Sequence, residues 1–238
     1  HNNWSMITDD GVNLLDPGKT PSENIQFLVF LMAVIKAVDE YADLLRISVA
    51  SAGNDHRLGA NEAPPAVVSI FLGDELTEVL KSIENDTYFT SHGAVQMDIG
   101  AIVLPHFVKD NTDRNRTSPF AFTGNKFEFR MLGSAASVAN PNIVLNTAVA
   151  EALDQFAKEL DGVAPEDMEH AVHELIKRAI KKHKRVIFNG NGYTDEWIEE
   201  AEKRGLYNLK STPDALPMWI AQKNIDLFTK HSIFTSEE

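Results

Sequence analysis

The 238-residue sequence contains no cysteine. Without a thiol, the chain cannot form disulfides, bind a metal through thiolates or use a cysteine nucleophile, and we expect a cytoplasmic location. Long apolar runs are also lacking. The longest, residues 25–38, contains Lys36 and is followed by Asp39 and Glu40, so it is shorter than the roughly 20 apolar residues of a membrane-spanning helix. This run predicts a buried helix and no membrane segment.

Basic residues are scarce. Lys and Arg total 22 against 35 Asp and Glu, which gives a net charge of -13 at pH 7. Such a charge repels phosphate backbones and anionic lipids, so we expect neither nucleic acid nor a membrane as a partner. With 43% hydrophobic and 24% charged residues, the composition is that of a soluble globular protein. The sequence starts at His1, with no initiating methionine or signal-peptide pattern, so we expect further residues upstream.

The first 140 residues mix helical and strand patterns. Thr20, Pro21 and Glu23 combine a capping residue, a proline at the first helical position and a glutamate three residues after the cap, which predicts a helix over residues 20–45. The other predicted elements are an ordered loop at 51–65, a helix at 65–84, a strand at 95–104, a polar turn at 109–116 and a strand at 126–131.

The strand at 126–131 alternates strictly between apolar and charged residues. Its apolar face holds Phe127, Phe129 and Met131, and its other face holds three charged residues, Lys126, Glu128 and Arg130. A charged face of this kind is either a solvated surface or the wall of a polar site, and the segment alone does not decide between them.

Long amphipathic helices dominate after Pro141. They are predicted at about residues 142–160, 165–184, 196–204 and 213–230, with at most a short strand at 186–188. We interpret the basic run at 177–185 as a solvated helix face. The change in pattern predicts two domains, residues 1–140 and 141–238.

Three segments carry candidate chemistry: HNNWS at 1–5, NDHRLGANEAPP at 54–65 and DRNRTSPFAFTGNKFEFR at 113–130. Taken singly, His1 is compatible with an ordinary terminal residue, Glu62 with a surface carboxylate, and Arg114 and Arg116 with solvated charges. Together they supply an imidazole and a carboxylate for a hard divalent cation, arginines for phosphate and a loop carboxylate for a proton. This inventory is typical of metal-assisted phosphoryl transfer.

These segments resemble four motifs of the glutamine synthetase family, in the same order. Residues 53–65 resemble the glutamate flap, and their sequence AGNDHRLGANEAPP (52–65) resembles that of the type III branch in particular. Residues 114–118 resemble the phosphate-binding RNRS segment. Residues 127–130, with Ala139-Asn140-Pro141 behind them, resemble the last metal-ligand strand, and residues 1–5 resemble the tail of the segment that carries a metal-binding histidine. The resemblance identifies residues 1–140 as similar to the C-terminal part of the catalytic domain, and 141–238 as similar to an incomplete type III C-terminal extension.

The resemblance implies ATP-dependent ligation of ammonia to L-glutamate through γ-glutamyl phosphate, with Mg²⁺ or Mn²⁺ as cofactor and ATP as co-substrate. The chain would therefore bind L-glutamate, ammonium and ATP. The implied roles are catalysis by Glu62 and Arg116; glutamate binding by Arg57, Gly59, Glu62 and Arg130; ATP or phosphate binding by Asn3, Ser5, Arg114, Arg116 and Lys126; and metal binding by His1 and Glu128. Lys126 and Asn3 depart from the family pattern, where arginine and a second histidine are common.

The implied fold is α+β: part of an antiparallel active-site sheet with packed helices, followed by an all-helical segment. Family members assemble into ring-type homo-oligomers with sites between subunits, and their other metal-binding glutamates lie upstream of His1, so the chain alone is expected to be inactive. Two alternatives stay open at this stage. One is a γ-glutamyl-amine ligase that uses an amine in place of ammonia, and the other is a non-catalytic oligomerisation or regulatory module carried by the helices after residue 140.

Overall fold

The computed structural model describes residues 1–60, 63–87 and 117–238. The helices and strands in these ranges follow in chain order: β1 (Asn2–Trp4), a 3-10 turn (Pro21–Glu23), α1 (Ile25–Glu40), α2 (Ala42–Ile47), α3 (Ala52–Arg57), β2 (Ile70–Phe71), α4 (Asp74–Glu84), β3 (Phe120–Phe122), β4 (Phe127–Phe129), α5 (Ala139–Leu160), α6 (Met168–His183), a 3-10 turn (Lys184–Val186), α7 (Asp195–Lys203), α8 (Thr212–Ala215), a 3-10 helix (Leu216–Ile220) and α9 (Gln222–Lys230). The predicted α+β class is confirmed. No helix in the described ranges is long and apolar enough to cross a membrane.

The sheet is small and mixed, with strand order β1-β4-β3-β2. The two pairs that involve β4 are antiparallel, as predicted, whereas β2 joins β3 in parallel. The chain's first strand therefore lies next to β4, although more than a hundred residues separate them in sequence. This pairing brings the N-terminal segment and the alternating 126–131 segment onto one surface.

Aromatic side chains fill the face of the sheet that meets the helices. Phe120, Phe127 and Phe129 are fully buried, and the ring of Phe120 stacks on that of Phe127 at 4.6 Å between centroids. Met131 is also 0% exposed, so the apolar face predicted for the 126–131 strand is confirmed. Because burial of each such ring contributes about 1.5–3 kcal/mol, this face fixes which side of β4 points away from the core.

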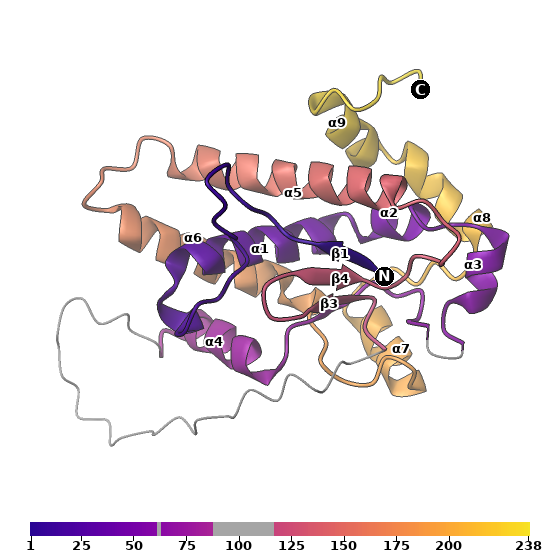
Figure 1. Ribbon diagram of the computed structural model, residues 1–238, viewed down its shortest axis with the longest axis horizontal. Helices are drawn as coiled ribbons and strands as arrows, with labels where there is room; N and C mark the ends of the chain where they lie inside the picture. Colours follow the sequence, from indigo (N-terminus) through magenta and orange to yellow (C-terminus); the bar gives the residue numbers. More distant parts are fainter. Residues whose placement is uncertain (61–62, 88–116) are drawn as a thin grey trace.

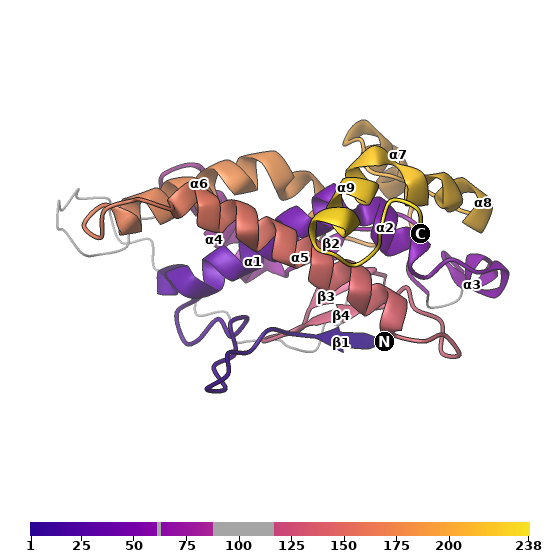
Figure 2. The ribbon, with the colours of Figure 1, turned by 90° about the horizontal axis from the view of Figure 1, so that it is seen from above.

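Helices cover this apolar face in layers. Figure 1 shows α1 and α5 running alongside each other over the sheet, and Figure 2 shows β1, β4 and β3 on one side of these helices and α6, α7 and α9 on the other. Helix α1 packs against both α5 and α6, which explains why eleven of its sixteen residues are buried. Two side chains of β1 reach α5: Asn2 Nδ2 donates to Asn142 Oδ1 at 2.7 Å, and Trp4 Nε1 donates to Asn146 Oδ1 at 2.8 Å.

Several predicted boundaries were wrong. The helix at 20–45 is capped by Asn24, whose Oδ1 accepts from Phe27 N at 3.0 Å, and not by Thr20. It also breaks at Tyr41 (φ −121°). The loop predicted at 51–65 contains α3, and the helix predicted at 65–84 starts only at Asp74, because the preceding apolar run supplies β2.

The helical prediction after residue 140 is largely confirmed. Helices α5, α6 and α7 match the predicted ranges to within three residues. The single helix predicted at 213–230 is instead three pieces, because Ala221 is extended (ψ 133°) between a 3-10 helix and α9. The strand predicted at 186–188 is reduced to one parallel bridge between Ile70 and Ile187. The strand at 95–104 and the turn at 109–116 lie outside the described residues, and the domain boundary near residue 140 stays a prediction.

A cluster of charges joins α5 to α9. Lys230 Nζ donates to Glu151 Oε2 at 2.6 Å and to Asp154 Oδ2 at 2.7 Å, and Lys158 Nζ donates to the same Asp154 oxygen at 2.8 Å. Hydrogen bonds from Lys158 and then Lys230 lower the pKa of Asp154 from its ordinary 3.8 to about 2. A carboxylate whose pKa is depressed on folding stabilises the protein above its unfolded pKa, and this contribution is lost as the pH falls through the folded pKa.

We therefore expect the Asp154→Asn variant to melt below the unchanged protein at pH 5, with the difference in melting temperature shrinking between about pH 4 and pH 2. Melting followed by circular dichroism at pH 5, 4, 3 and 2 checks this. A difference that stays constant across these pH values would show that the Asp154 carboxylate does not titrate as described.

Candidate functional site

The polar face of the β1–β4 pair collects six of the predicted site residues. In the register of this pair, Asn3 lies opposite Glu128, and Trp4 lies opposite Phe127. Because side chains alternate along a strand, the face that carries Glu128 also carries five others: His1, Asn3, Ser5, Lys126 and Arg130. The sequence places them in two segments far apart, and the antiparallel pairing of β1 with β4 makes them neighbours.

The centre of this face is Glu128. His1 Nδ1 lies 3.6 Å from Glu128 Oε2, and the two side chains are 54% and 17% exposed. Arg130 donates to the same oxygen through Nε at 3.2 Å and Nη2 at 3.1 Å, and its side chain is only 3% exposed. The charged face is therefore not a solvated surface at Glu128 and Arg130.

The donor set of His1 and Glu128 fits a hard divalent cation. With metal–ligand distances of about 2.0–2.2 Å for Mg²⁺ or Mn²⁺, two ligand atoms about 3–4 Å apart can share one ion, and their Nδ1 and Oε2 atoms are 3.6 Å apart. No third His, Asp or Glu joins them in a cluster within the described ranges. These two residues could therefore supply two ligands of a coordination sphere.

Arg57 reaches the end of β4 from helix α3. Its Nη1 donates to the Met131 carbonyl at 3.0 Å, and its Nη2 donates to the Arg130 carbonyl at 3.1 Å. These bonds place the guanidinium of Arg57 beside the strand end that also carries Arg130. Gly59 follows in a turn with φ +80°, and its N–H donates to the Pro64 carbonyl at 2.9 Å. The two arginines predicted to bind glutamate are thus brought together.

Two of the residues predicted to contact ATP, Ser5 and Lys126, lie toward the β3–β4 turn. Ser5 Oγ donates to Asn13 Oδ1 at 2.8 Å and to the Asn125 carbonyl at 3.0 Å. Lys126 Nζ donates to Thr123 Oγ1 at 3.2 Å. Asn3 is exposed on the same face. These contacts hold the turn and β1 together, and nothing in them distinguishes a nucleotide site from a polar surface.

Three predicted site residues, Glu62, Arg114 and Arg116, lie outside the described residues. Two residues that the sequence analysis did not single out are important neighbours of the site. Asn54, buried on α3, donates through Nδ2 to the Met131 carbonyl at 2.9 Å, and Asp55 pairs with the buried Arg46 at 2.7 Å. Both belong to the NDHR motif, but the sequence alone does not reveal their partners.

One other group among the described residues could hold a metal ion, formed by Asp86, His173 and Glu174 with ligand atoms within 4.8 Å of one another. It lies between the end of α4 and helix α6, away from the β1–β4 face. Lys177 forms an ion pair with Asp86. An ammonium in contact with this carboxylate opposes a cation at the same place, so the group is better explained as a link between the two helices.

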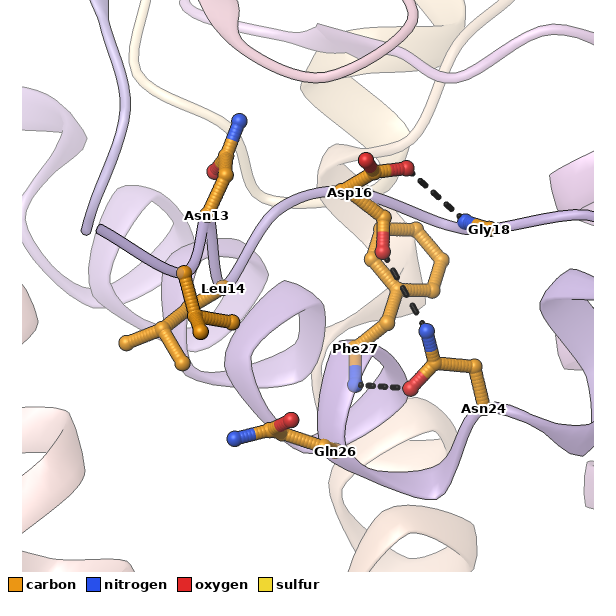
Figure 3. A pocket seen from close by; sticks show the side chains of 8 residues that line it. Asn13, Leu14, Asp16, Gly18, Asn24, Gln26 and Phe27 are labelled. Atoms are coloured by element: carbon orange, nitrogen blue, oxygen red, sulfur yellow. Dashed lines mark hydrogen bonds between the residues drawn. The ribbon is translucent and has the colours of Figure 1, made fainter. Parts of the chain in front are cut away.

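Two cavities of about 400 and 420 Å³ occur in the described part of the chain. The first lies between the 12–18 segment and the start of α1 (Figure 3), and two of the polar side chains that line it make local hydrogen bonds. Asp16 accepts from Gly18 N at 2.9 Å, and Asn24 caps α1. In the second, between α4 and α6, Lys184 pairs with Glu84 at 2.6 Å and Arg185 with Asp39 at 2.7 Å. Neither cavity is lined by a predicted site residue.

Residues 171–238 match the family model of the glutamine synthetase C-terminal domain. The whole chain aligns with a glutamine synthetase from Butyrivibrio fibrisolvens at 58% identity and with a type-3 glutamine synthetase from Dictyostelium discoideum at 54% identity. The chain belongs to the glutamine synthetase family. A glutamine synthetase from Bacteroides fragilis is 43% identical over the same length. The identity to the type-3 protein over the entire chain confirms the predicted type III branch.

The chain spans about a third of the length of these glutamine synthetases: 34%, 32% and 33% of the three relatives. The similarity thus covers all 238 residues, which correspond to only part of each relative. Within this segment, His1, Glu128, Arg130 and Arg57 lie close together around β4.

Proposed function

We propose that the chain supplies part of the active site of an ATP-dependent glutamate–ammonia ligase. The observation that carries this proposal is the contact of His1 with Glu128, 3.6 Å between Nδ1 and Oε2, beside the buried Arg130. An imidazole and a carboxylate on one sheet face, next to two arginines, suit a divalent cation and a substrate with a carboxylate and a phosphoryl group. The family membership supports the same chemistry.

His1 and Glu128 would hold Mg²⁺ or Mn²⁺. When bound, this ion neutralises charge on the transferring phosphoryl group. Arg57 and Arg130 bind the carboxylates of L-glutamate, since a guanidinium offers paired donors to a carboxylate. Gly59, through its left-handed turn, lets the chain double back after Arg57 within the segment that resembles the glutamate flap.

Asn3, Ser5 and Lys126 contact the nucleotide at the β3–β4 end of the face. Arg114 and Arg116 neutralise the phosphate during transfer, and Glu62 accepts a proton from ammonium, because ammonium is not nucleophilic until it is deprotonated. Exclusion of water by the segment that contains Glu62 would spare γ-glutamyl phosphate from hydrolysis. The complete enzyme works as a cytoplasmic ring-type homo-oligomer.

The test uses a protein that contains this sequence and is as long as the three relatives; we call it the full-length protein. With ATP, L-glutamate and Mg²⁺, we expect ammonium-dependent formation of glutamine and ADP in equal amounts. Short amines such as methylamine are offered as the alternative nucleophile. No glutamine formation would overturn the ligase proposal, and faster turnover of methylamine than of ammonium would replace it with an amine ligase.

A further inference from the structure

Helix α3, which carries Arg57, is too short to hold its own position. It has six residues, and Asn54 is the only one that is buried. Helices much shorter than about 12 residues are not stable alone, and α3 has almost no apolar burial to fix it. Its position therefore depends on polar contacts of Asn54, Asp55 and Arg57.

On one side, these contacts attach α3 to the end of β4. Asn54 Nδ2 and Arg57 Nη1 donate to the same carbonyl, that of Met131, at 2.9 and 3.0 Å. Arg57 Nη1 also donates to Asn54 Oδ1 at 3.1 Å. The guanidinium of Arg57 is thus fastened next to Arg130, and the bonds to β4 all meet α3 at the strand end.

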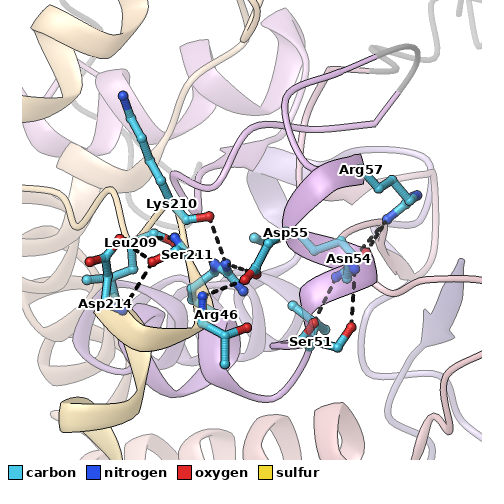
Figure 4. A network of polar contacts seen from close by, with 12 residues as sticks. Arg46, Ser51, Asn54, Asp55, Arg57, Leu209, Lys210, Ser211 and Asp214 are labelled. Carbon is cyan, nitrogen blue, oxygen red and sulfur yellow. Dashed lines mark hydrogen bonds and ion pairs between the residues drawn. The ribbon is translucent and has the colours of Figure 1, made fainter.

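On the other side, Asp55 attaches α3 to a segment more than 150 residues later (Figure 4). Its Oδ1 accepts from Arg46 Nη2 at 2.7 Å, and its Oδ2 accepts from the backbone N–H of Thr212 at 2.6 Å. Arg46, only 1% exposed, also donates to the carbonyls of Leu209 at 2.6 Å and Lys210 at 3.2 Å. Arg46 and Asp55 therefore bind α2, α3 and residues 209–212 into one unit.

The negative charge of Asp55 favours the contacts that join α2, α3 and residues 209–212. Burial alone raises the pKa of Asp55, but hydrogen bonds from Arg46 and Thr212 outweigh it and hold the pKa below its ordinary value of 3.8. Asp55 is thus ionised at neutral pH, and both oxygens accept hydrogen bonds whose strength depends on that charge. Because Asp55 stands two positions before Arg57, a change in its contacts rotates the helix that presents the guanidinium.

We propose that Asp55 is a positioning residue through which residues 209–212 of the C-terminal helical region set the position of Arg57. Residues 209–212 lie within the part of the chain that matches the glutamine synthetase C-terminal domain. One part of this inference, that Arg57 binds glutamate, rests on the proposed function. The other part, that the position of α3 is coupled to residues 209–212, does not rest on the proposed function.

The first test replaces Asp55 with asparagine, which keeps the shape and removes the charge. In the full-length protein we expect KM for L-glutamate to rise about 10-fold, while KM for ATP and kcat change less than about 3-fold, because a misplaced binding group costs ground-state affinity. Asp55→Glu, which keeps the carboxylate, should lie closer to the unchanged enzyme. A general loss of structure would change all three constants together.

The matched control is Glu84→Gln. Like Asp55, Glu84 pairs with a cation, here Lys184 at 2.6 Å, and its side chain is 14% exposed against 17% for Asp55. It lies on α4, away from α3, so KM for glutamate should not change. Equal effects of the two substitutions would overturn the proposal, since loss of any such ion pair would then suffice.

A second variant, Thr212→Pro, acts from the other side of the contact and never touches Arg57. It removes the N–H that Asp55 accepts, at the first position of α8, where proline is tolerated; the preceding Ser211 is already extended, with ψ 159°, as proline requires. We expect the same increase in KM for glutamate, smaller in size. This variant keeps the question decidable if Asp55→Asn does not fold.

Hydrogen exchange of the full-length protein tests the coupling without any assay. Peptides over residues 52–60 and 209–214 should both exchange faster in Asp55→Asn and Thr212→Pro, and not in Glu84→Gln. Unchanged exchange at 52–60 would overturn the coupling. Faster exchange with unchanged KM for glutamate in an active enzyme would overturn the positioning role. If the full-length protein without any substitution has no ligase activity, the proposed function is refuted. The exchange data alone would then test the coupling.

Discussion

Replacing Glu128 with alanine in the full-length protein is expected to lower kcat for glutamine formation at least about 100-fold, because loss even of groups that only support metal ligands costs 10–100-fold. Glu128 is the carboxylate that both His1 and Arg130 approach. Its removal takes away the proposed anionic ligand and the carboxylate that accepts from the buried guanidinium of Arg130. The required Mg²⁺ concentration should rise as well, which an assay over a range of Mg²⁺ and a Mn²⁺-binding titration would measure.

Two comparisons separate chemistry from folding in this prediction. Glu128→Gln keeps a hydrogen-bond acceptor for Arg130 but loses the negative charge, so its structure should be preserved while its metal affinity falls. Glu84→Ala removes a carboxylate of similar exposure, 14% against 17%, from a distant ion pair, and should leave kcat unchanged. Full activity of the Glu128→Ala enzyme would refute the metal assignment.

The strand that carries Glu128 could be predicted because its sequence has a single period. Phe127 and Phe129 alternate with charged residues, and only a strand buries the first set while presenting the second. The partner strand β1 was less predictable, since three residues beginning at Asn2 carry no clear period. The family resemblance, not periodicity, linked His1 to Glu128, and their 3.6 Å approach depends on the β1–β4 register.

The apolar run before α4 shows where periodicity fails. Val67, Val68 and Ile70 are all nearly fully buried, and a short continuous apolar run suits a buried strand as well as a helix. Tertiary context decides the outcome. Residues 70–71 pair with β3, and Gly73, with φ +83°, ends the extended stretch before α4 begins.

The contacts of Asp55 show a second limit. Its partner Thr212 is 157 positions away, and helices α4 to α7 of the described residues lie in between. A single sequence shows that α3 is polar and rich in glycine and asparagine, which favours a loop. It does not show that a carboxylate in this segment meets a backbone N–H near the other end of the chain, because such a pair has no periodic pattern.

The largest effect on stability is expected at Asp39, on the buried face of α1. Its Oδ2 lies 2.8 Å from His183 Nδ1, its Oδ1 accepts from Arg185 Nε at 2.7 Å, and the side chains of Asp39 and His183 are both 3% exposed. Asp39→Ala removes the shared acceptor and takes from the buried His183 Nδ1 the carboxylate that it contacts between α1 and α6, whereas Arg185, 44% exposed, still donates to the carbonyls of Arg204 and Gly205. Breaking a buried pair in this way costs about 3–5 kcal/mol, which corresponds to a fall in melting temperature of roughly 6–20 °C for a domain of this size.

Asp39→Asn and Asp154→Ala make this prediction specific to buried charge. The amide keeps the shape of Asp39 and one acceptor, so Asp39→Asn should lose less than Asp39→Ala. Asp154 has two cationic partners, Lys158 and Lys230, but its side chain is 34% exposed. Its substitution at pH 7 should lower the melting temperature far less, because water replaces the lost contacts. Melting curves of the three variants test this prediction. Equal shifts in melting temperature for Asp39→Ala and Asp154→Ala would mean that burial does not set the strength of the Asp39 contacts. Apolar packing alone would then hold α1 to α6.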